Sequence, residues 1–313
     1  MKNLVKIRGD ASYRKFFRKK NKTSSSILVF SKKEKIKNLL VYDAMNKVLN
    51  KNKILAPQLY NHYYNKNYIE IQDFGNNTIH KILKKKGVNK FYYFKKIIRT
   101  LIQIQSIKDK KTKNFKKKNY IIPEYDKKIL IQEANLFCDW YVKKNLSKEK
   151  RYFFEKKFKK IIKNLVSSLK LKNNVLVHRD FHVSNLMLVN KQIGVIDSQD
   201  ALIGNKAYDL ASLIDDVRLE TSKSLKSKIY NYYLKNQKNL EKTKFDNDFE
   251  ILSILRNLKI IGIFTRLAYR DGKKNYLRLI PYTWKLIAMR INNNEVFNQL
   301  KYLLFQNFKN KMR

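Results

Sequence analysis

Hydrophobic and polar residues alternate over short runs in the first third of the chain, a pattern typical of β-strands. β-branched and aromatic residues concentrate in VKI, SYRKFFRKK and SSILVF, which turn-forming GDA and KNKTS separate. QLYNHYY and YIEIQ flank a tight NKN turn and predict a hairpin. Between these strands, apolar residues recur with helical spacing from about residue 35 to 49. The pattern therefore predicts a β-rich N-terminal part that contains one helix.

From about residue 78 onward, apolar positions recur mainly with the 3.6-residue period of a helix. The predicted helices lie at about 78–86, 89–106, 128–145 and 149–170, and from residue 206 to the end. Three apolar runs, VLVH, LML and IGVID, interrupt the helices and are predicted strands. The predicted fold class is α+β and bilobal, with a small β-rich N-lobe at 1–75 and a larger, mainly helical C-lobe at 76–313. Clefts between two lobes are common ligand sites.

Composition supports a globular protein and argues against nucleic-acid binding. The chain has 313 residues, of which 43% are hydrophobic, enough for a substantial core. Its formal net charge of +45 prompts a nucleic-acid hypothesis. However, 57 of its 70 basic residues are lysines, spread through nearly every segment. Proteins that bind nucleic acids tend to favour arginine, so we expect no specific nucleic-acid partner.

Cysteine usage and hydropathy predict a cytoplasmic protein without a membrane partner. The single cysteine, Cys138, cannot form a disulfide within the chain, and we expect it to be a small buried residue. The N-terminus lacks the continuous apolar segment of a signal peptide. The longest apolar stretch, IIGIF, is too short to span a bilayer.

VLVHRDFHVSNLMLVNKQIGVIDSQD, residues 175–200, places polar residues where two apolar runs end. Phosphoryl transfer needs a base to orient the attacking hydroxyl and oxygen ligands for Mg²⁺. The loop between Asp180 and Asn185 allows both side chains to face one site, and the following hairpin returns Asp197 beside Asn185. We predict Asp180 as the catalytic base, with Asn185 and Asp197 as Mg²⁺ ligands. His178 would position the loop by hydrogen bonding to the backbone or to Asp197. Capping, turn and solvated roles for the three site residues are the alternative.

The same stretch resembles the catalytic core of the aminoglycoside phosphotransferase and choline kinase superfamily, which shares its fold with protein kinases. It departs from protein kinases because Asp197-Ser198-Gln199 replaces the D-F-G motif and no A-P-E motif or activation loop follows. The resemblance therefore implies a protein-kinase-like fold and a small acceptor rather than a protein.

Three further stretches resemble one subfamily, the anomeric kinases of cell-wall sugars. They are RGDASYRKFFR, EANLFCDWY and RNLKIIGIFTRLAYRDGKKNYL. VIDSQDALIGNKAYDLASLIDD is also similar to the subfamily's segment after the second catalytic strand. This resemblance implies ATP and Mg²⁺ as cofactors, and phosphorylation of the C1 hydroxyl of N-acetylmuramate or N-acetylglucosamine.

Candidate nucleotide contacts lie in two segments of the N-lobe. GDASYRKFFR is a glycine turn before a strand, and Gly9 permits close backbone approach to a phosphate. The predicted phosphate contacts are Gly9, Asp10, Ala11, Ser12 and Arg14; an ordinary hairpin with solvated cations is the alternative. IEIQDFG resembles the connector between kinase lobes, which implies adenine contacts at the backbone of Glu70, Ile71 and Gln72.

One feature of the kinase pattern is missing from the third predicted strand. Kinases place a phosphate-binding lysine there, but SSILVFSKK has Phe30 or Ser31 at that position. Lys32 and Arg14 are both open as substitutes.

The predicted acceptor contacts are Glu133, Trp140, Asp200 and Arg266. Glu133 lies beside an aromatic stripe in EANLFCDWY, whose rings form either a core or a sugar platform. Four of the 13 arginines fall within residues 256–278, where they would grip a substrate carboxylate or form structural ion pairs. Asp200 would contact substrate or a second metal ion. His182 would contact substrate or form a local hydrogen bond.

Two other functions stay open on the sequence. One is a kinase of another small alcohol, such as an aminoglycoside, choline or homoserine. The positive net charge favours a neutral or anionic acceptor over a cationic one. The other is a non-catalytic basic protein that binds nucleic acid, and the complete set of Asp180, Asn185 and Asp197 argues against it.

Overall fold

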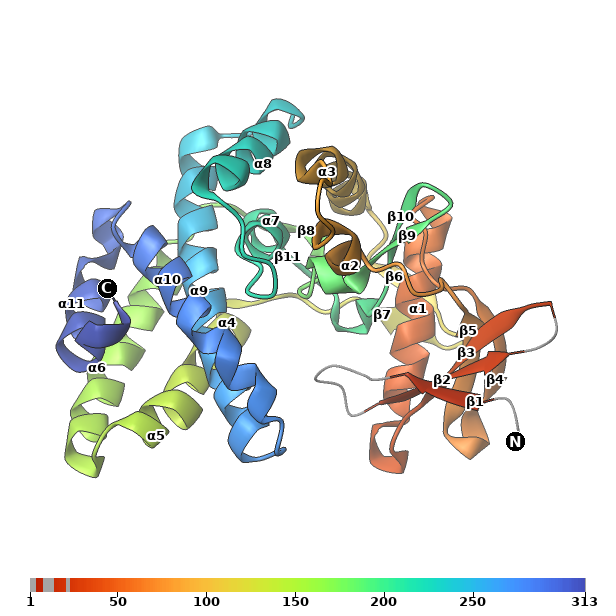
Figure 1. Cartoon of the computed structure of the whole chain (residues 1–313), viewed down its shortest axis with the longest axis horizontal. Helices are drawn as coiled ribbons and strands as arrows, with labels where there is room; N and C mark the ends of the chain where they lie inside the picture. The colour runs from red at the N-terminus through yellow and green to blue at the C-terminus, as the bar shows by residue number, and fades with distance from the viewer. Residues whose placement is uncertain (1–3, 8–13, 21–22, 313) are drawn as a thin grey trace. The chain divides into compact units, whose positions relative to one another are not determined.

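The computed structural model describes residues 4–7, 14–20 and 23–312, and the chain forms two compact units (Figure 1). The first unit comprises Met1–Pro123 and Val175–Ile203, and the second comprises Glu124–Asn174 and Gly204–Arg313. The division runs through two strands that pair with each other, β8 (Asn173–Val177) and β11 (Leu202–Asn205). The predicted lobes at 1–75 and 76–313 were assigned different functions, and that assignment stays a prediction.

A five-stranded antiparallel sheet forms the N-terminal part of the first unit, with the strand order β1-β2-β3-β5-β4. Its strands are β1 (Leu4–Ile7), β2 (Lys15–Lys20), β3 (Ser25–Phe30), β4 (Leu59–Tyr63) and β5 (Tyr68–Gln72). A short 3₁₀ turn, η2 (Tyr64–Lys66), joins β4 to β5, and Asn67 adopts the left-handed conformation that closes the predicted hairpin. All five predicted strands of the N-terminal part are present.

Helix α1 (Lys37–Lys51) packs on one face of this sheet, after the 3₁₀ turn η1 (Lys33–Lys35). Alternate residues of β3 and β5 point toward the helix because successive side chains of a strand face opposite sides. The buried cluster comprises Ile27, Val29, Ile69 and Ile71 from the strands and Leu39 and Tyr42 from α1. The sheet and the helix therefore share one hydrophobic core.

Besides parts of β8 and β11 and short 3₁₀ turns, the described rest of the first unit has two helices and two hairpins. They are α2 (Ile79–Leu83), α3 (Lys90–Ser106), the β6 (Lys111–Lys113) and β7 (Asn119–Ile121) pair, and the β9 (Leu186–Val189) and β10 (Gln192–Val195) pair. The sequence did not predict β6, β7 or β11. The first two have only three residues each, too few for alternation to be recognised.

The second unit is mainly helical. Its helices are α4 (Lys127–Leu136), α5 (Lys143–Asn145), α6 (Lys148–Ser167), α7 (Ala207–Ile214), α8 (Lys223–Lys235), α9 (Lys242–Tyr269), α10 (Ile280–Ile291) and α11 (Asn298–Phe308). Shorter turns are η6 (Lys274–Leu279), η7 (Glu295–Phe297) and η8 (Lys309–Lys311). Asp126, Ser147 and Ser222 cap α4, α6 and α8 by accepting backbone N–H bonds. The α+β prediction, a sheet followed by mainly helical chain, is confirmed.

One predicted helix, 128–145, is divided in the structure. A π-helical turn, η3 (Phe137–Val142), separates α4 from α5. Helix α9 approaches the chain at this point: a Cβ at Gly262 would lie 2.3 Å from the backbone carbonyl of Leu136. Such a close contact between two backbones is invisible to hydrophobic periodicity, because it depends on a segment more than 100 residues away.

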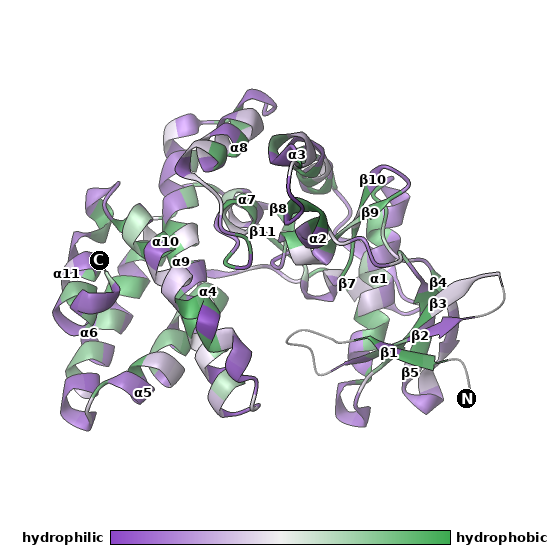
Figure 2. Cartoon of the chain, viewed as in Figure 1, coloured by the Kyte–Doolittle hydropathy of each residue, from purple (hydrophilic) through white to green (hydrophobic). Residues whose placement is uncertain are grey.

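Aromatic residues fill the core of the second unit. Phe137, Tyr141 and Trp284 are buried and in ring contact with one another. Figure 2 shows hydrophobic and hydrophilic residues alternating along α6, which buries Phe154 and Phe158 and exposes lysines. Among the described residues, no helix is long and apolar enough to cross a membrane.

Candidate active site

The loop after β8 carries Asp180 and Asn185 and is closed by its own hydrogen bonds. The backbone oxygen of Asp180 accepts from the His182 amide at 3.0 Å and from Nδ2 of Asn185 at 3.1 Å. A 3₁₀ turn, η4 (Val183–Asn185), leads into β9. Asp180 and Asn185 are five positions apart in the chain, and the bond from the Asn185 side chain joins them directly.

The β9–β10 hairpin returns Asp197 to the same place. Asn190 and Lys191 have φ angles of 46° and 64°, as a tight hairpin turn requires. Beyond the hairpin, the Ile196 amide donates to the backbone oxygen of Asn185 at 3.0 Å. Nε2 of His178 lies 3.1 Å from the backbone oxygen of Ile196, which directly precedes Asp197. His178 therefore makes a backbone contact next to Asp197, while its catalytic role stays a prediction.

Two residues of this region have left-handed backbone conformations. Arg179 has φ 71°, and Asp197 has φ 67° at the start of the 3₁₀ turn η5 (Ser198–Asp200). Such conformations cost of order 1–3 kcal/mol for residues other than glycine and concentrate at functional sites. Arg179 precedes the predicted base Asp180, and Asp197 is itself a predicted metal ligand, which supports a functional role for this segment.

Asp197 is the electrostatic centre of the group. Nη2 of Arg14 lies 2.6 Å from Oδ1 of Asp197, whose side chain is 32% exposed. Burial raises the pKa of Asp197; the charge of Arg14 lowers it, whereas Asp180 and Asp200 raise it. The charges of Asp180 and Asp200 therefore both act on Asp197, and a cation beside Asp197 is electrostatically favoured.

The donor set of this region fits a magnesium ion. Nδ2 of Asn185 donates to the backbone of Asp180, and the amide oxygen of the same side chain is of the hard type that can bind a metal ion. Carboxylate and amide oxygens are the hard ligands that Mg²⁺ prefers, and one or two carboxylates suffice because phosphates and water complete the shell. Asn185 and Asp197 would supply these oxygens.

Asp200 takes part in a local network on the same unit. Its carboxylate accepts from Nε2 of Gln199 at 2.5 Å, and its backbone oxygen accepts from Nη1 of Arg179 at 3.2 Å. Tyr120 of β7 lies within electrostatic range: burial raises its pKa, and the charge of Asp200 raises it further. Sequence reasoning missed Tyr120, because no motif marks the three-residue strand that carries it.

The predicted nucleotide contacts differ in where they lie. Gly9, Asp10, Ala11 and Ser12 are outside the described residues. Glu70 and Ile71 belong to β5, an inner strand paired on both sides with β3 and β4. The Gln72 amide donates to the backbone of Gln58 at 2.8 Å. The adenine contacts stay a prediction. Asp73 is the first residue after β5.

The connector after β5 is held by one arginine of β2. Arg18 donates to both carboxylate oxygens of Asp73, at 2.5 and 2.9 Å, and also contacts Asn76 and the Gly75 carbonyl. The Asp73 side chain is almost fully buried. A bidentate pair of this kind fixes orientation as well as charge. Arg18 therefore ties the sheet to the start of the connector.

Glu133, a predicted acceptor contact, lies in a polar group of the second unit. It accepts a short hydrogen bond from the Tyr125 hydroxyl, and Nζ of Lys259 lies 2.8 Å from its other oxygen. Lys259 also donates to the Tyr208 hydroxyl at 3.4 Å. Trp140 is half-buried, whereas Phe137 and Tyr141 of the same stripe are core residues.

The arginines of residues 256–278 have separate environments. Arg256 is buried and its guanidinium reaches the backbone oxygen of Asp215, and exposed Arg270 pairs with Asp271. These two contacts favour a structural role for Arg256 and Arg270 over binding of a substrate carboxylate. Arg266 is half-buried, and its pKa is lowered, first by burial and then by the charge of Arg270. Its role toward an acceptor stays a prediction.

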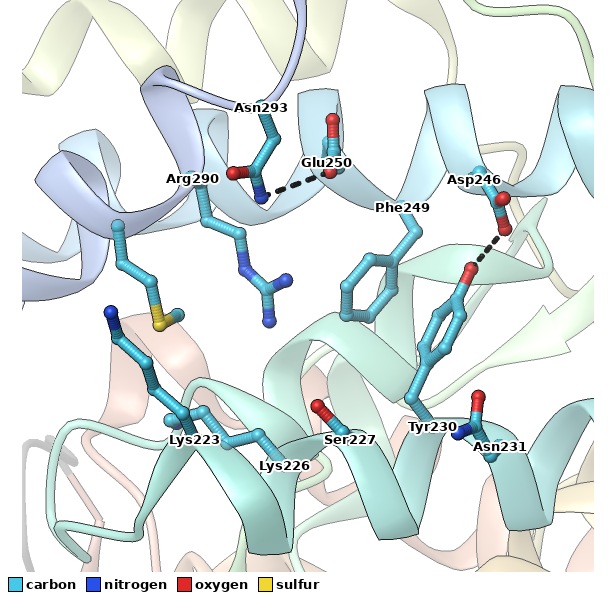
Figure 3. A pocket seen from close by; sticks show the side chains of 11 residues that line it. Lys223, Lys226, Ser227, Tyr230, Asn231, Asp246, Phe249, Glu250, Arg290 and Asn293 are labelled. Atoms are coloured by element: carbon cyan, nitrogen blue, oxygen red, sulfur yellow. Dashed lines mark hydrogen bonds between the residues drawn. The ribbon is translucent and has the colours of Figure 1, made fainter.

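A separate cavity of about 430 Å³ lies among α8, α9 and α10 of the second unit (Figure 3). Arg290 and Lys226, which line it, both reach buried Asp215, and its wall also carries the Tyr230–Asp246 and Asn293–Glu250 hydrogen bonds. None of the residues predicted to contact the acceptor lines this cavity. These polar side chains thus make hydrogen bonds among themselves.

The five-stranded sheet followed by a mainly helical chain is the arrangement expected of a kinase-like fold. The chain belongs to the phosphotransferase enzyme family, and the family match spans residues 3–245. The prediction of a member of the aminoglycoside phosphotransferase and choline kinase superfamily is therefore confirmed, as is that of a phosphotransferase.

Comparison with known proteins gives relatives of one name. An "N-acetylmuramate/N-acetylglucosamine kinase" of Neisseria meningitidis is 29% identical over 287 residues, covering 89% of this chain and 83% of the relative. A protein of the same name from Pseudomonas putida is 25% identical over 285 residues, covering 89% and 80%. Among solved structures, an ADP-bound aminoglycoside phosphotransferase is 17% identical, covers 94% of each chain and gives a TM-score of 0.58. The structural likeness establishes the fold alone.

Proposed function

We propose that this protein transfers the γ-phosphoryl group of ATP to the anomeric C1 hydroxyl of N-acetylmuramate, N-acetylglucosamine or both. The proposed phosphotransfer residues are Asp180, Asn185 and Asp197. The proposal is supported by the bond from the Ile196 amide to the Asn185 backbone and by the action of the Asp180 charge on Asp197. The acceptor is supported by relatives of that name, which match about nine-tenths of this chain. The role of the reaction would be to return cell-wall sugars to metabolism, in the cytoplasm.

In the proposed mechanism, Asp180 accepts the proton of the C1 hydroxyl as its oxygen attacks the γ-phosphorus. The bond from that phosphorus to the bridging oxygen breaks, and ADP leaves. Mg²⁺, held by Asn185 and Asp197, would neutralise charge on the phosphate oxygens. The bonds from His182 and Asn185 to the Asp180 backbone hold the base in place.

The remaining assignments complete the proposal. Residues 1–75 would form the nucleotide-binding lobe, and 76–313 the catalytic and acceptor-binding lobe. The proposed acceptor contacts are Glu133, Trp140, Asp200 and Arg266. Glu133 and its partners Tyr125 and Lys259 offer sugar hydroxyls both donors and acceptors.

The test is a phosphorylation assay of the purified protein with ATP and Mg²⁺. The acceptor panel comprises N-acetylmuramate, N-acetylglucosamine, their methyl glycosides, choline, ethanolamine and kanamycin. We expect turnover of at least one free sugar, none of its methyl glycoside, and a product whose phosphorus couples to H1 in NMR spectra. Turnover of choline, ethanolamine or kanamycin with both sugars unmodified would show that the acceptor is wrong.

A further inference from the structure

The position of the missing third-strand lysine can be located from the strand register. Lys15 of β2 pairs with Phe30 of β3, and Phe16 pairs with Val29. Continuing this antiparallel register by one residue places Arg14 opposite Ser31. Val29 lies in the cluster with α1, and Phe16 packs against that cluster. Because side chains alternate along a strand, Arg14 and Ser31 belong to the same α1-facing side.

The guanidinium of Arg14 contacts Asp197, a predicted metal ligand. It reaches Oδ1 of Asp197 at 2.6 Å, and the Arg14 side chain is only 4% exposed. Its central carbon lies 5.5 Å from the ring centre of Tyr42 in α1 and 5.7 Å from that of Phe16. Both distances are within the range of cation–π attraction.

Helix α1 presents an aromatic ring to this cation. Burial raises the pKa of Tyr42 to about 12, so its phenol is neutral at physiological pH. The neighbouring carboxylate, Asp43, is turned to Lys47 at 2.8 Å. The contact between Arg14 and α1 is thus a cation on a neutral ring.

The other candidate cation of this region has a different environment. Lys32 is exposed and lies one residue beyond Ser31, on the opposite side of the strand alternation. Ser31 is buried, and its hydroxyl donates to the Lys35 backbone at 3.0 Å. The geometry therefore favours Arg14 over Lys32 as the cation that replaces the third-strand lysine.

We propose that Arg14 is the cation that binds the ATP phosphates, moved from the third strand to the facing position of the second, and that Tyr42 is its positioning residue. This inference rests on the proposed role of Asp197 at the metal–phosphate site. The planar guanidinium has several N–H donors, so it can keep one on Asp197 and direct another to a phosphate oxygen.

The experiment measures ATP·Mg²⁺ affinity by calorimetry and the KM for ATP in the best acceptor assay. For Arg14→Ala we expect a loss of about 10–100-fold in affinity, as for a charge-assisted hydrogen bond. Lys15→Ala, the adjacent exposed cation on the other face, is the matched control and should change affinity less than about twofold. Arg14→Ala with near-normal affinity would overturn the inference.

A second experiment tests whether the phosphate-binding cation has moved from the third strand to the facing position of the second, by placing a lysine back at the third-strand position. In the Arg14→Ala background, Ser31→Lys should recover at least about tenfold of the lost affinity, because it restores one charge-assisted contact. Failure of Ser31→Lys to recover any affinity, in a variant that folds by circular dichroism, would contradict relocation between facing positions.

The role of Tyr42 is tested by a pair of substitutions. Tyr42→Phe keeps the ring and should keep the KM for ATP, whereas Tyr42→Leu should raise that KM with the acceptor KM unchanged. Equal ATP kinetics in the two variants would remove Tyr42 from this role. Calorimetry needs no acceptor, so a wrong sugar assignment would leave the Arg14 result intact.

Discussion

The Ser198 hydroxyl donates a hydrogen bond of 2.8 Å to Oδ1 of Asn46, and both side chains are buried. Nδ2 of the same amide donates to the Pro57 carbonyl at 2.9 Å. One side chain of α1 therefore holds both the segment before β4 and the residue directly after Asp197. This contact links the helix on the sheet to the predicted metal-binding turn.

We expect the Asn46–Ser198 contact to contribute directly to stability. A double-mutant cycle with Asn46→Ala and Ser198→Ala should give a coupling energy of about 0.5–1.5 kcal/mol in urea unfolding. Ser198→Ala alone leaves a buried amide oxygen without its donor, so it should destabilise the protein more than a surface substitution such as Ser106→Ala. A coupling energy near zero would mean that the two side chains act independently.

Replacing Asp180 by Asn should separate catalysis from nucleotide binding. The amide cannot accept the acceptor's proton, so turnover should fall by about 10²–10⁴-fold. The affinity for ATP·Mg²⁺, measured by calorimetry, should stay within a few-fold of wild type. Asp109→Asn, the same charge change at a carboxylate paired with Lys51, serves as the control. Near-normal turnover of Asp180→Asn would exclude Asp180 as the base.

The Arg18–Asp73 pair predicts a pH-dependent stability. Burial alone would raise the pKa of Asp73, but hydrogen bonds from Arg18, Ser25 and the Gly75 amide lower it below its ordinary 3.8. A lowered acid pKa means that the stabilisation is complete above about pH 4 and is lost as the pH falls through the folded value. Arg18→Lys should therefore cost about 1–3 kcal/mol at pH 7 because lysine cannot form the bidentate pair.

Chemical unfolding of wild type and Arg18→Lys at pH 7 and at pH 3 measures this effect. The difference between them should shrink at the lower pH. A difference that is the same at both values would show that Arg18 stabilises through packing instead.

Asp215 should be among the most sensitive positions of the second unit. It is buried and bonded to Arg290, Lys226 and Ser253. Burial alone would raise its pKa, but the charges of Arg290 and Lys226 outweigh this and lower it. Asp215→Asn leaves both cations without their carboxylate, which should cost about 3–5 kcal/mol in denaturant unfolding.

The control for Asp215 is a carboxylate of the same unit that is largely exposed. Glu241, paired with Lys244, has a side chain that is 65% exposed. Glu241→Gln should change the unfolding free energy by less than about 0.5 kcal/mol. Similar small effects at both positions would show that the cations around Asp215 find other partners.

Gly262 is expected to tolerate no side chain. Alanine within a helix is ordinarily more stable than glycine by about 0.5–1 kcal/mol. Here its Cβ would lie 2.3 Å from the Leu136 backbone, so Gly262→Ala should instead destabilise by about 1–3 kcal/mol or more. Gly194→Ala, where the close neighbour is the movable ring of Phe74, should have a smaller effect on the melting temperature. A stabilised Gly262→Ala would show that α4 can shift.

The predicted strands and helices follow local rules, and their failures show the limits of those rules. The strands predicted at SSILVF and YIEIQ are present, and both are buried through their central residues. Cys138 is buried as expected, and burial raises its thiol pKa. The helix at 128–145 was predicted as continuous because its local pattern is helical throughout. The structure is helical there but changes to a π-helical turn at η3, next to the close approach of Gly262 in α9, which no local window contains.

The sequence by itself determined the predicted catalytic segment, because Asp180, Asn185 and Asp197 are joined by one short loop and one hairpin. Hydrogen bonding within such short segments leaves few ways to separate those side chains. Only the tertiary structure decided which cation meets Asp197, since Arg14 is 183 positions away along the chain. That contact depends on how the sheet packs against α1 and the hairpin. Val29, Leu39 and Ile71 are buried where the sheet packs against α1, and no short-range spacing encodes that long-range contact.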